Sequence, residues 1–393
     1  MNPIESGMIN RRRILGDAWV DKSLSEANAL TAEFQMLITR RAWDEVWGRN
    51  HAGAIDDKTR RMLVLAMTLG MGRYEEFGMH VKSALSSTND TALTIDTIKE
   101  IVFQGAVYCG VPAANTAMHV IADVLKSQNA MPPALHVVRS GEVSSSKSTV
   151  VLSHALGFNC SMWDGIIPEL AKQFNVIAYD HRGQGGSEKS ATDFSIDALV
   201  DDAAAVIIRE VFAKGGGPVH FVGLSMGGMV AQALAARYPH LVKSIVVANS
   251  AMRYDDAAQA LWRGRIETVK TKGMSAIIDL ATTRWFTPEF RAANPSVIER
   301  VTAILLANEP TAYARSCAAI STIDFRRSNA SIQSPALVIA GEKDVSTVPA
   351  LSADIAASIK GAKLVSIDAA HVSVVERPSE FLEHCLPFFV RPV

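Results

Sequence analysis

Several features are scarce in this 393-residue sequence, and each shortage argues against a class of protein. The cysteines number only four, and none belongs to a CxxC pair: Cys109, Cys160, Cys317 and Cys385. A disulfide framework or a thiolate metal site is therefore not expected, and we predict no metal. The 39 basic and 40 acidic residues nearly cancel, so we expect no nucleic-acid partner.

Long apolar runs are also missing. None approaches the roughly 20 residues that a membrane-spanning helix needs, so no membrane association is expected. The opening MNPIESGMINRRRILGD has no apolar segment behind a basic start, unlike a secretory signal. With the scattered cysteines, this pattern predicts a cytoplasmic protein. The apolar content of 48% is still enough for a full core, and the length predicts two domains.

The character of the sequence changes near residue 130. Helical periodicity dominates residues 1–130, which predicts an all-α domain with amphipathic helices over Ala29–Ala42, Asp57–Met71, Tyr74–Ser86, Thr94–Tyr108 and Pro112–Lys126. Residues 131–147 contain Met-Pro-Pro and the polar stretch GEVSSSK, which are typical of a linker. We interpret the short ALHVV between them as a strand.

Residues 148–393 alternate between strand-like and helical segments. The strand-like runs are STVVLSHA, FNVIAYD, PVHFVGLS, VKSIVVANS, PALVIAGEKD and AKLVSIDAA. Helical patterns such as Ile196–Phe212 and Met226–Tyr238 separate them, which predicts a doubly wound α/β fold with a mostly parallel sheet. Only helical patterns occur from about residue 251 to 327, and this insertion predicts a helical lid.

The strongest chemical signal is GLSMG at residues 223–227, which follows a strand-like run and precedes a helical one. In that context the small residues allow a tight turn that exposes the serine, so we predict Ser225 as a nucleophile. A serine hydroxyl needs a base, and the base needs an orienting acid. Asp344 and His371 both follow strand-like runs downstream, and we predict them as acid and base. Asp368 is a competing acid, which we expect inside its strand.

An oxyanion hole should lie beside this serine. The loop SHALG follows the first long strand-like run, and the residue after the nucleophile begins a helix. We predict that the backbone N–H groups of Leu156 and Met226 form the hole.

The helical domain carries a mixed stripe along one predicted helix. Arg73, Glu76 and His80 are spaced i, i+3, i+7 at the border of its apolar face. A cation, an acid and an imidazole there could hold an anionic substrate and move a proton. The alternative is an exposed, salt-bridged helix edge.

From Val150 to Val390 the sequence resembles the 3-oxoadipate enol-lactonases of the α/β-hydrolase superfamily. The motifs that carry this resemblance are LSHALGFNCSMWD, VIAYDHRGQGGS, FVGLSMGGMVAQALAARYP, RWFTPEF, VIAGEKDVSTVP and AAHVSVVERP. It implies hydrolysis of a small lactone without a cofactor. It also implies that lid residues such as Trp285 approach the substrate, although Trp285 could equally be part of the lid core.

Residues 5–126 resemble the 4-carboxymuconolactone decarboxylases. The motifs are RRRILGDAWVD, ITRRAWDEVWGR, TRRMLVLAMTLGMGRYEEFGMHVKSAL and IVFQGAVYCGVPAANTAM. The resemblance implies a cofactor-free decarboxylation and a homo-oligomer formed through this domain. Arginines would bind the substrate carboxylates, the candidates being Arg49, Arg60, Arg61 and Arg73. His80 would supply the proton, with Glu76 orienting it.

The two resemblances name consecutive steps, because the decarboxylase product is the substrate of the lactonase. They predict a bifunctional enzyme of the β-ketoadipate (protocatechuate) pathway that converts 4-carboxymuconolactone to 3-oxoadipate. The alternative is a serine esterase or lactonase of other specificity with a non-catalytic helical oligomerisation domain.

Overall fold

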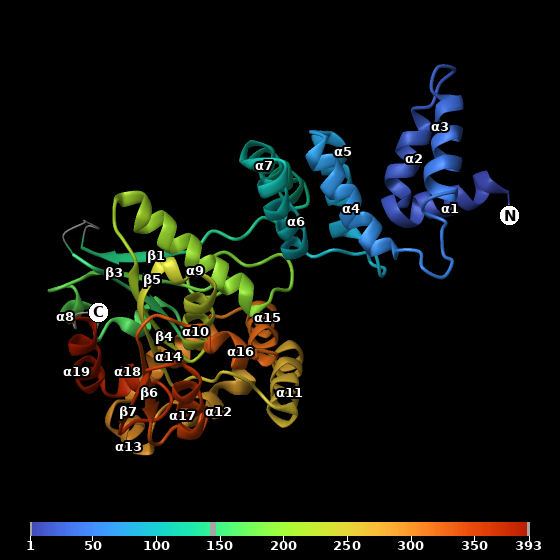
Figure 1. Ribbon diagram of the computed structural model, residues 1–393. Helices are drawn as coiled ribbons and strands as arrows, with labels where there is room; N and C mark the ends of the chain where they lie inside the picture. Colours follow the sequence, from blue (N-terminus) through green and yellow to red (C-terminus); the bar gives the residue numbers. More distant parts are fainter. Residues whose placement is uncertain (1, 142–146, 391–393) are drawn as a thin grey trace. The chain divides into compact units, whose positions relative to one another are not determined.

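The structure is a computed structural model that describes residues 2–141 and 147–390. Most of the predicted polar stretch GEVSSSK falls at residues 142–146 and lies outside the described residues. The chain divides into two compact units, Met1–Met131 and Pro132–Val393 (Figure 1). No helix of the described ranges is both long enough and apolar enough to cross a bilayer.

The described part of the N-terminal unit contains helices and no strand, as predicted (Figure 1). Its elements are α1 (Pro3–Leu15), α2 (Asp17–Ser25), α3 (Ala32–Ile38), a π-helical segment (Thr39–Asp44), α4 (Asp57–Gly70), α5 (Tyr74–Ser86), α6 (Ile95–Tyr108) and α7 (Val111–Ser127). Pro112 lies in the first turn of α7, where its missing N–H costs no hydrogen bond. The helix expected from Ala29 begins only at Ala32 and continues as the π-helical segment.

Two apolar clusters hold this unit together. The cluster between α4, α5, α6 and α7 includes Leu65, Phe77 and Ile98, which are fully buried. A smaller cluster joins α1 and α2 to the π-helical segment through Ile14 and Trp43, among others. Close backbone contact also needs Gly7 of α1, because a Cβ there would lie 2.2 Å from the Thr39 carbonyl oxygen.

The C-terminal unit is built on a seven-stranded sheet in the order β1-β3-β2-β4-β5-β6-β7. The strands are β1 (Val137–Ser140), β2 (Thr149–Ser153), β3 (Asn175–Tyr179), β4 (Val219–Leu224), β5 (Val242–Ala248), β6 (Ala336–Gly341) and β7 (Lys363–Ile367). All neighbours are parallel except β1, which is antiparallel to β3. The prediction of a mostly parallel sheet is confirmed, while the strand expected at ALHVV begins later, at Val137.

Helices cover both faces of this sheet. They are α8 (Ile167–Leu170), α9 (Ile196–Glu210), α10 (Met226–Arg237), α16 (Arg326–Asn329), α17 (Pro349–Ser358), α18 (Ser373–Glu376) and α19 (Pro378–Phe389). Figure 1 shows α8 and α19 on one side of the strands and α9 and α10 on the other. Every residue of β2, β3, β4 and β6 is buried, as expected of parallel strands covered on both faces.

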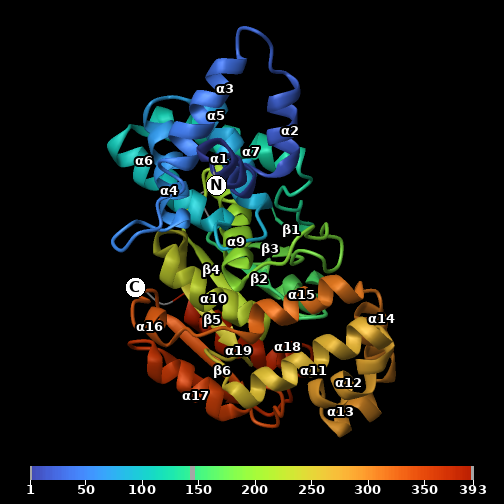
Figure 2. The ribbon, with the colours of Figure 1, turned by 90° about the vertical axis from the view of Figure 1, so that its right-hand side faces the viewer.

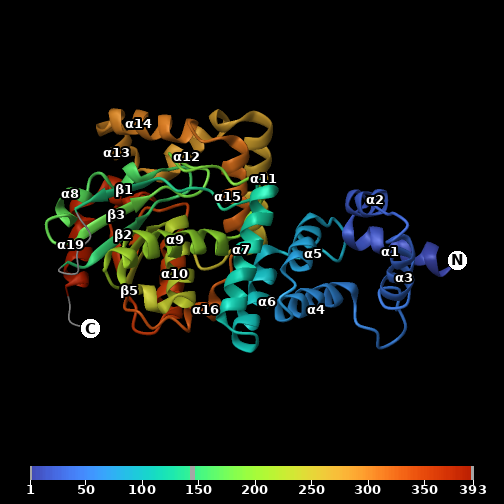
Figure 3. The ribbon, with the colours of Figure 1, turned by 90° about the horizontal axis from the view of Figure 1, so that it is seen from above.

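The lid is an insertion between β5 and β6. It consists of α11 (Asp256–Lys272), α12 (Ile278–Trp285), α13 (Pro288–Ala293), α14 (Pro295–Leu306) and α15 (Pro310–Ser321). These helices gather in gold and orange at one end of the C-terminal unit in Figures 2 and 3. Apart from the connecting turns, the described residues of the insertion form helices and one isolated bridge, between Arg253 and Asp324, so the prediction of a helical lid is confirmed.

Candidate active sites

Ser225 lies at a sharp turn between β4 and α10. Its φ of 56° and ψ of −113° place it in a backbone region that non-glycine residues rarely adopt. Three backbone hydrogen bonds hold it there: its N–H donates to the Ala248 carbonyl (2.9 Å), and its carbonyl accepts from the Ser250 hydroxyl (2.8 Å) and the Met229 N–H (3.0 Å). The turn presents the Ser225 side chain at the carboxyl end of the sheet, where parallel α/β folds bind ligands.

The glycines on either side make this turn possible. A Cβ on Gly223 would lie 1.9 Å from the Gly227 carbonyl oxygen. A Cβ on Gly227 would lie 1.9 Å from the Ser153 carbonyl oxygen, at the end of β2. The start of α10 therefore approaches β2 more closely than any side chain permits.

His371 and Asp344 complete a chain of hydrogen bonds from Ser225. Nε2 of His371 lies 2.9 Å from the Ser225 Oγ, and Nδ1 lies 2.8 Å from Oδ2 of Asp344. With the proton on Nδ1, the imidazole donates to the carboxylate and accepts from the serine hydroxyl. The structure thus brings together the three residues predicted as nucleophile, base and acid.

The Asp344 carboxylate is buried but fully hydrogen-bonded. Oδ1 accepts from the backbone N–H groups of Ser346 (2.7 Å) and Thr347 (2.9 Å). Oδ2 accepts from the Asn249 amide (3.0 Å) and the Thr347 hydroxyl (2.7 Å). Burial alone would raise the pKa of Asp344, but His371, Asn249 and Thr347 outweigh it and lower that pKa. The acid therefore stays ionised beside His371.

Asp368, the competing acid, lies elsewhere. The expectation that it falls inside its strand is wrong, because β7 ends at Ile367. Its carboxylate forms an ion pair with Lys343 (2.7 Å), with both side chains about half exposed. That pair lowers the pKa of Asp368 and leaves the carboxylate on the surface.

The predicted oxyanion hole has two available donors. Leu156 and Met226 are both buried, and neither N–H donates a hydrogen bond to another described residue. The loop that carries Leu156 is held in place at Gly157, whose N–H donates to Gln184 Oε1 (2.7 Å). The Gly157 carbonyl accepts a hydrogen bond (3.1 Å) from Nδ2 of Asn308, two residues after the end of α14. A lid residue thus helps to fix the loop of the oxyanion hole.

The lid also contacts the loops of the acid and the base through the RWFTP motif. Arg284 donates to the Val345 carbonyl (2.7 Å), next to Asp344. The Trp285 carbonyl accepts from the N–H of Val372, next to His371 (3.1 Å).

A buried carboxylate makes a further link, because the Thr287 hydroxyl donates to Glu376, which also accepts from the Ala370 N–H (3.0 Å). These bonds couple α12 to both catalytic loops.

Trp285 itself is buried within the lid. Its ring packs against Phe158, with centroids 4.9 Å apart. A Cβ built on Gly157 would lie 3.6 Å from the same ring. The indole therefore closes over the loop of the oxyanion hole, which is compatible with both roles considered for it.

Sequence reasoning missed three residues that support these groups, Asn249, Thr347 and Glu376. Asn249 directly follows β5 and has a φ of 46°, and Thr347 lies in the turn after β6. Position after a parallel strand was the available signal for both. Glu376 lies inside the AAHVSVVERP motif, but no sequence pattern near it indicates that it bonds the lid residue Thr287.

In the N-terminal unit, three members of the predicted set are buried: His80, Arg60 and Arg61. Arg61 is fully buried, and its Nη2 donates to the Ile14 carbonyl (2.6 Å). Its Nε and Nη1 have no hydrogen-bond partner among the described residues. Burial and the nearby Arg61 lower the pKa of His80 to about 4, and Glu76 opposes this only in part. The imidazole is therefore neutral near pH 7.

The other candidates in this unit are exposed, except Arg60. Arg73 is exposed and precedes α5 as its N-cap, so it does not continue the helical stripe as expected. Arg49 is exposed, with its Nη2 3.1 Å from His51 Nε2. Arg60 is buried and lies near Asp57 (3.7 Å). Glu76 is exposed, and no described hydrogen bond joins it to His80.

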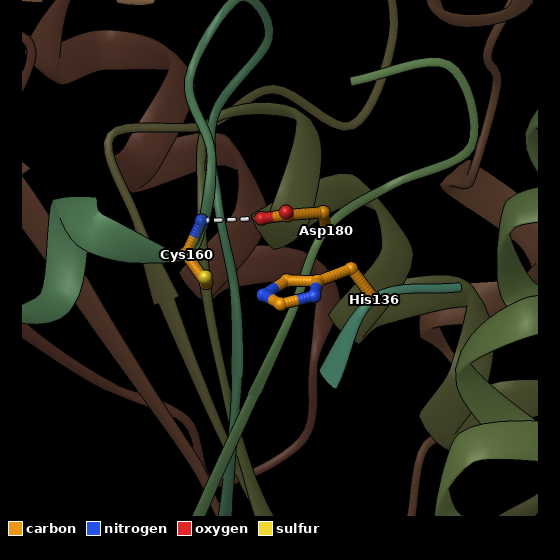
Figure 4. Close-up of side chains that lie close together, drawn as sticks. All are labelled: His136, Cys160 and Asp180. Atoms are coloured by element: carbon orange, nitrogen blue, oxygen red, sulfur yellow. Dashed lines mark hydrogen bonds between the residues drawn. The ribbon is translucent and has the colours of Figure 1, made fainter. Parts of the chain in front are cut away.

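One group of described side chains in the C-terminal unit has metal-ligand chemistry. Figure 4 shows His136, Cys160 and Asp180, whose ligand atoms lie within 4.8 Å of one another. Both Asp180 oxygens already accept backbone hydrogen bonds, from Cys160 (2.6 Å) and Gly186 (2.8 Å). Burial and Asp180 raise the pKa of the Cys160 thiol to about 12, which opposes thiolate formation. We assign the carboxylate to holding these loops together.

A cavity of about 470 Å³ lies in the C-terminal unit. It is lined by residues of α9, α10, α15 and α16 and their flanks, including Ser195, Arg237, Thr322 and Phe325. It contains none of the residues predicted to act in catalysis, so its volume does not locate the chemistry.

Comparisons with known proteins divide the chain in the same two parts. The family model described as alpha/beta hydrolase fold matches residues 148–378, and that of the Carboxymuconolactone decarboxylase family matches residues 32–123. A 3-oxoadipate enol-lactonase of Acinetobacter baylyi is 33% identical over 259 residues, covering 66% of this chain and 93% of the relative. A 4-carboxymuconolactone decarboxylase of the same organism is 33% identical over 128 residues, covering 33% of this chain and 90% of the relative.

A solved structure agrees with the larger match. The crystal structure of the enol-lactonase from Burkholderia xenovorans LB400 has a TM-score of 0.62 and 32% identity, covering 66% of this chain and 97% of that one. The predicted combination of a carboxy-lyase family and an ester hydrolase family is therefore confirmed. The chain belongs to the α/β-hydrolase family over its C-terminal part and to the carboxymuconolactone decarboxylase family over its N-terminal part.

Proposed function

We propose that this chain is a bifunctional enzyme of protocatechuate catabolism, acting in the cytoplasm without a cofactor. Its N-terminal domain decarboxylates 4-carboxymuconolactone to 3-oxoadipate enol-lactone, and its C-terminal domain hydrolyses that lactone to 3-oxoadipate. The names of the relatives support the order, because the product of one reaction is the substrate of the other. The observation that carries the proposal is the hydrogen-bond chain from Ser225 through His371 to Asp344.

Hydrolysis begins with attack of the Ser225 Oγ on the lactone carbonyl. His371 Nε2 takes the hydroxyl proton, and the ionised Asp344 stabilises the imidazolium that forms. The carbonyl oxygen becomes an oxyanion that the Leu156 and Met226 N–H groups bind. The ring oxygen then leaves as an enol by taking the proton from His371, and the enol converts to the ketone.

The acyl-enzyme is released by water. His371 removes a proton from the water as it attacks the Ser225 ester, and returns that proton to the Ser225 Oγ. Ring opening thus consumes one water and leaves a carboxylate and a ketone.

For decarboxylation, Arg61 and His80 are the best-placed residues. Loss of CO₂ from the γ-carbon sends its electron pair into a dienolate on the lactone carbonyl, and protonation at the α-carbon completes the reaction. Arg61 is the arginine we favour for the substrate's negative charge, because its Nε and Nη1 lack hydrogen-bond partners among the described residues. Of the other arginines considered, Arg49 and Arg73 are exposed to solvent, and Arg60 is buried but lies 3.7 Å from the Asp57 carboxylate.

His80 must gain a proton before it can donate one. Its pKa of about 4 applies without substrate, when burial and Arg61 disfavour the charged form. A bound dianion would offset the charge of Arg61 and raise the pKa of His80. Glu76 acts in the same direction. Substrate binding would thus be coupled to proton uptake.

Two variants of the full-length protein test the assignment of the steps. Ser225→Ala should release CO₂ from 4-carboxymuconolactone and accumulate the enol-lactone, with hydrolysis lowered by roughly 10⁶-fold, leaving slow background turnover. His80→Ala should release no CO₂ but hydrolyse added enol-lactone at the wild-type rate. Normal lactonase turnover by the first variant, or normal CO₂ release by the second, would refute the corresponding assignment.

A second function for the helical domain is oligomerisation, either alongside catalysis or in its place. Large apolar side chains of α4 and α6 and the start of α7 are exposed: Leu63, Met67, Phe103, Val107, Tyr108 and Val111. Apolar residues gathered on helices in this way are typical of a subunit interface. Val107→Glu with Val111→Glu should lower the mass measured by light scattering if copies of this chain associate here. A wild-type monomer would contradict the oligomer, and CO₂ release by the wild type would exclude a purely structural domain.

A further inference from the structure

Arg265 is a cation of the lid that has no acidic partner among the described residues. It lies in α11, and its guanidinium stands over the Trp262 ring, 5.4 Å from the centroid. The side chain is partly buried, and it forms no ion pair with another described residue. An aromatic ring can hold a guanidinium in place without neutralising it, so Arg265 remains available to an anion.

Tyr313 supplies a second unused donor close to Arg265. It lies in α15, the helix that packs along α11, and its side chain is fully buried. Its hydroxyl has no hydrogen-bond partner among the described residues. Burial raises the pKa of Tyr313, and the nearby Arg265 lowers it in part, so the hydroxyl keeps its proton. An unpaired buried hydroxyl costs free energy, which a ligand that accepts its hydrogen bond would recover.

This pair of donors is next to the proposed hydrolytic site. A Cβ built on Gly157, beside Leu156, would lie 3.2 Å from the Tyr313 ring. Tyr254 provides a second connection, because its ring packs against the Trp262 ring that Arg265 stands over, with the two ring centroids 5.8 Å apart. Burial and Asp344 raise the pKa of Tyr254, and Arg265 lowers it in part.

We infer that Arg265 and the Tyr313 hydroxyl form a carboxylate-binding subsite under the lid, which selects lactones that carry a free carboxylate. The inference rests on the proposed lactonase function. In 3-oxoadipate enol-lactone, the ring oxygen, the γ-carbon and a methylene group separate the free carboxylate from the reacting carbonyl. A carboxylate bound at Tyr313, whose ring packs against Gly157, would therefore lie only a few atoms from a carbonyl at the loop of the oxyanion hole. Arginine and a neutral hydroxyl together match the two oxygens of a carboxylate.

The test compares two lactones that differ only in this carboxylate. α-Angelica lactone has a methyl group where the enol-lactone has its carboxymethyl group. For full-length Arg265→Met, the ratio of kcat/KM for the enol-lactone to kcat/KM for α-angelica lactone should fall about 30-fold, mainly through KM. Arg263→Met, which removes an exposed cation from the same helix, should keep the wild-type ratio.

Tyr313→Phe distinguishes an effect on carboxylate binding from an effect on stability. The ratio should fall about 5-fold, while the melting temperature should be unchanged or raised, because the lost hydroxyl has no hydrogen-bond partner among the described residues. Adipate should inhibit hydrolysis of α-angelica lactone by the wild type, and Arg265→Met should weaken this inhibition by a similar factor to its effect on the ratio.

The outcomes distinguish this inference from the proposed function. An equal loss on both lactones, or an unchanged ratio in Arg265→Met, would overturn the subsite. If the wild type fails to hydrolyse the enol-lactone, the proposed function fails. Adipate inhibition that depends on Arg265 would still support the subsite in that case, and inhibition indifferent to Arg265 would overturn it.

Discussion

Asp344 is the residue where burial and hydrogen bonding oppose each other most directly. Its carboxylate is buried, yet its pKa is lowered because every oxygen accepts hydrogen bonds from a turn built for it. The Thr347 side chain supplies one of these bonds without contributing charge. The effect of losing this hydrogen bond can therefore be tested at Thr347 without changing Asp344 itself.

Thr347→Val should therefore weaken hydrolysis without removing a proposed catalytic group. Valine keeps the shape of threonine but loses the hydroxyl bond to Oδ2, so the pKa of Asp344 should rise and the His371 imidazole should be held less firmly. We expect kcat for enol-lactone to fall about 10-fold, since a hydrogen bond to a charged group contributes about 1.5 kcal/mol or more. Thr347→Ser keeps the hydroxyl and should stay near wild type. Equal losses in both variants would contradict this role.

His80 gives a second prediction at this scale, for stability. Its pKa is about 4 in the folded protein and near 6.5 when unfolded, so the unfolded chain binds the proton more readily. Its contribution is fully present above pH 6.5 and is lost as the pH falls toward 4. Between pH 6.5 and 5 the N-terminal domain should lose about 2 kcal/mol through this residue.

This loss can be measured by urea unfolding, with hydrogen exchange of peptides from α5 as the readout of the unfolding of the N-terminal domain. His80→Gln cannot titrate and should lose less stability over the same pH range. The control is His119→Gln, which removes an exposed histidine of α7 and should keep the wild-type response. An unchanged pH response in His80→Gln would contradict the burial of a neutral imidazole.

Among the elements, the junction of β2, β4 and α10 depends on backbone contact. Gly227→Ala would place a methyl group 1.9 Å from the Ser153 carbonyl oxygen, so α10 would have to move away from β2. We expect a loss of about 3 kcal/mol or more in unfolding free energy and loss of hydrolysis. Gly264→Ala on α11 meets no atom within 4 Å and should not destabilise the protein. A thermal melt of both variants is the measurement, and a stable, active Gly227→Ala would contradict the account of the turn.

The link between α12 and the His371 loop gives the second prediction for elements. Glu376 is buried and accepts from both Thr287 and the Ala370 N–H, one residue before His371. Glu376→Ala would leave these donors unpaired, and should lower the unfolding free energy by about 2 kcal/mol and also slow hydrolysis. Glu383→Ala, at an exposed position of α19, is the control. Full activity with Glu376→Ala would show that the lid does not position His371.

For the whole molecule, the features predicted from the sequence are those that depend on a local pattern of apolar and polar residues, namely the strands, most of the helices and the turn at Ser225. The alternating runs after Ser148 became β2 to β7, and the GLSMG context placed Ser225 at the end of β4. The helices α4 to α7 were also predicted because each has an apolar face. In contrast, α1 and α2 were not named, since their sequences are polar and their buried faces are narrow.

The contacts that join distant segments were not predictable in this way. Nothing local indicates that Thr287 bonds Glu376, or that Asn308 bonds the Gly157 loop. Likewise, four arginines were equivalent candidates in the sequence, and only burial and hydrogen bonding distinguish Arg61 from Arg49 and Arg73. These differences arise from tertiary packing, which spacing along the chain does not record.

The central claim is that one polypeptide performs both steps with its own side chains. The most direct measurement follows CO₂ and 3-oxoadipate together, after full-length protein dialysed against a chelator is given 4-carboxymuconolactone alone. The account predicts equal molar amounts of the two products, with no added metal or nicotinamide. No CO₂ from this substrate, or a dependence on an added metal or nicotinamide, would contradict it.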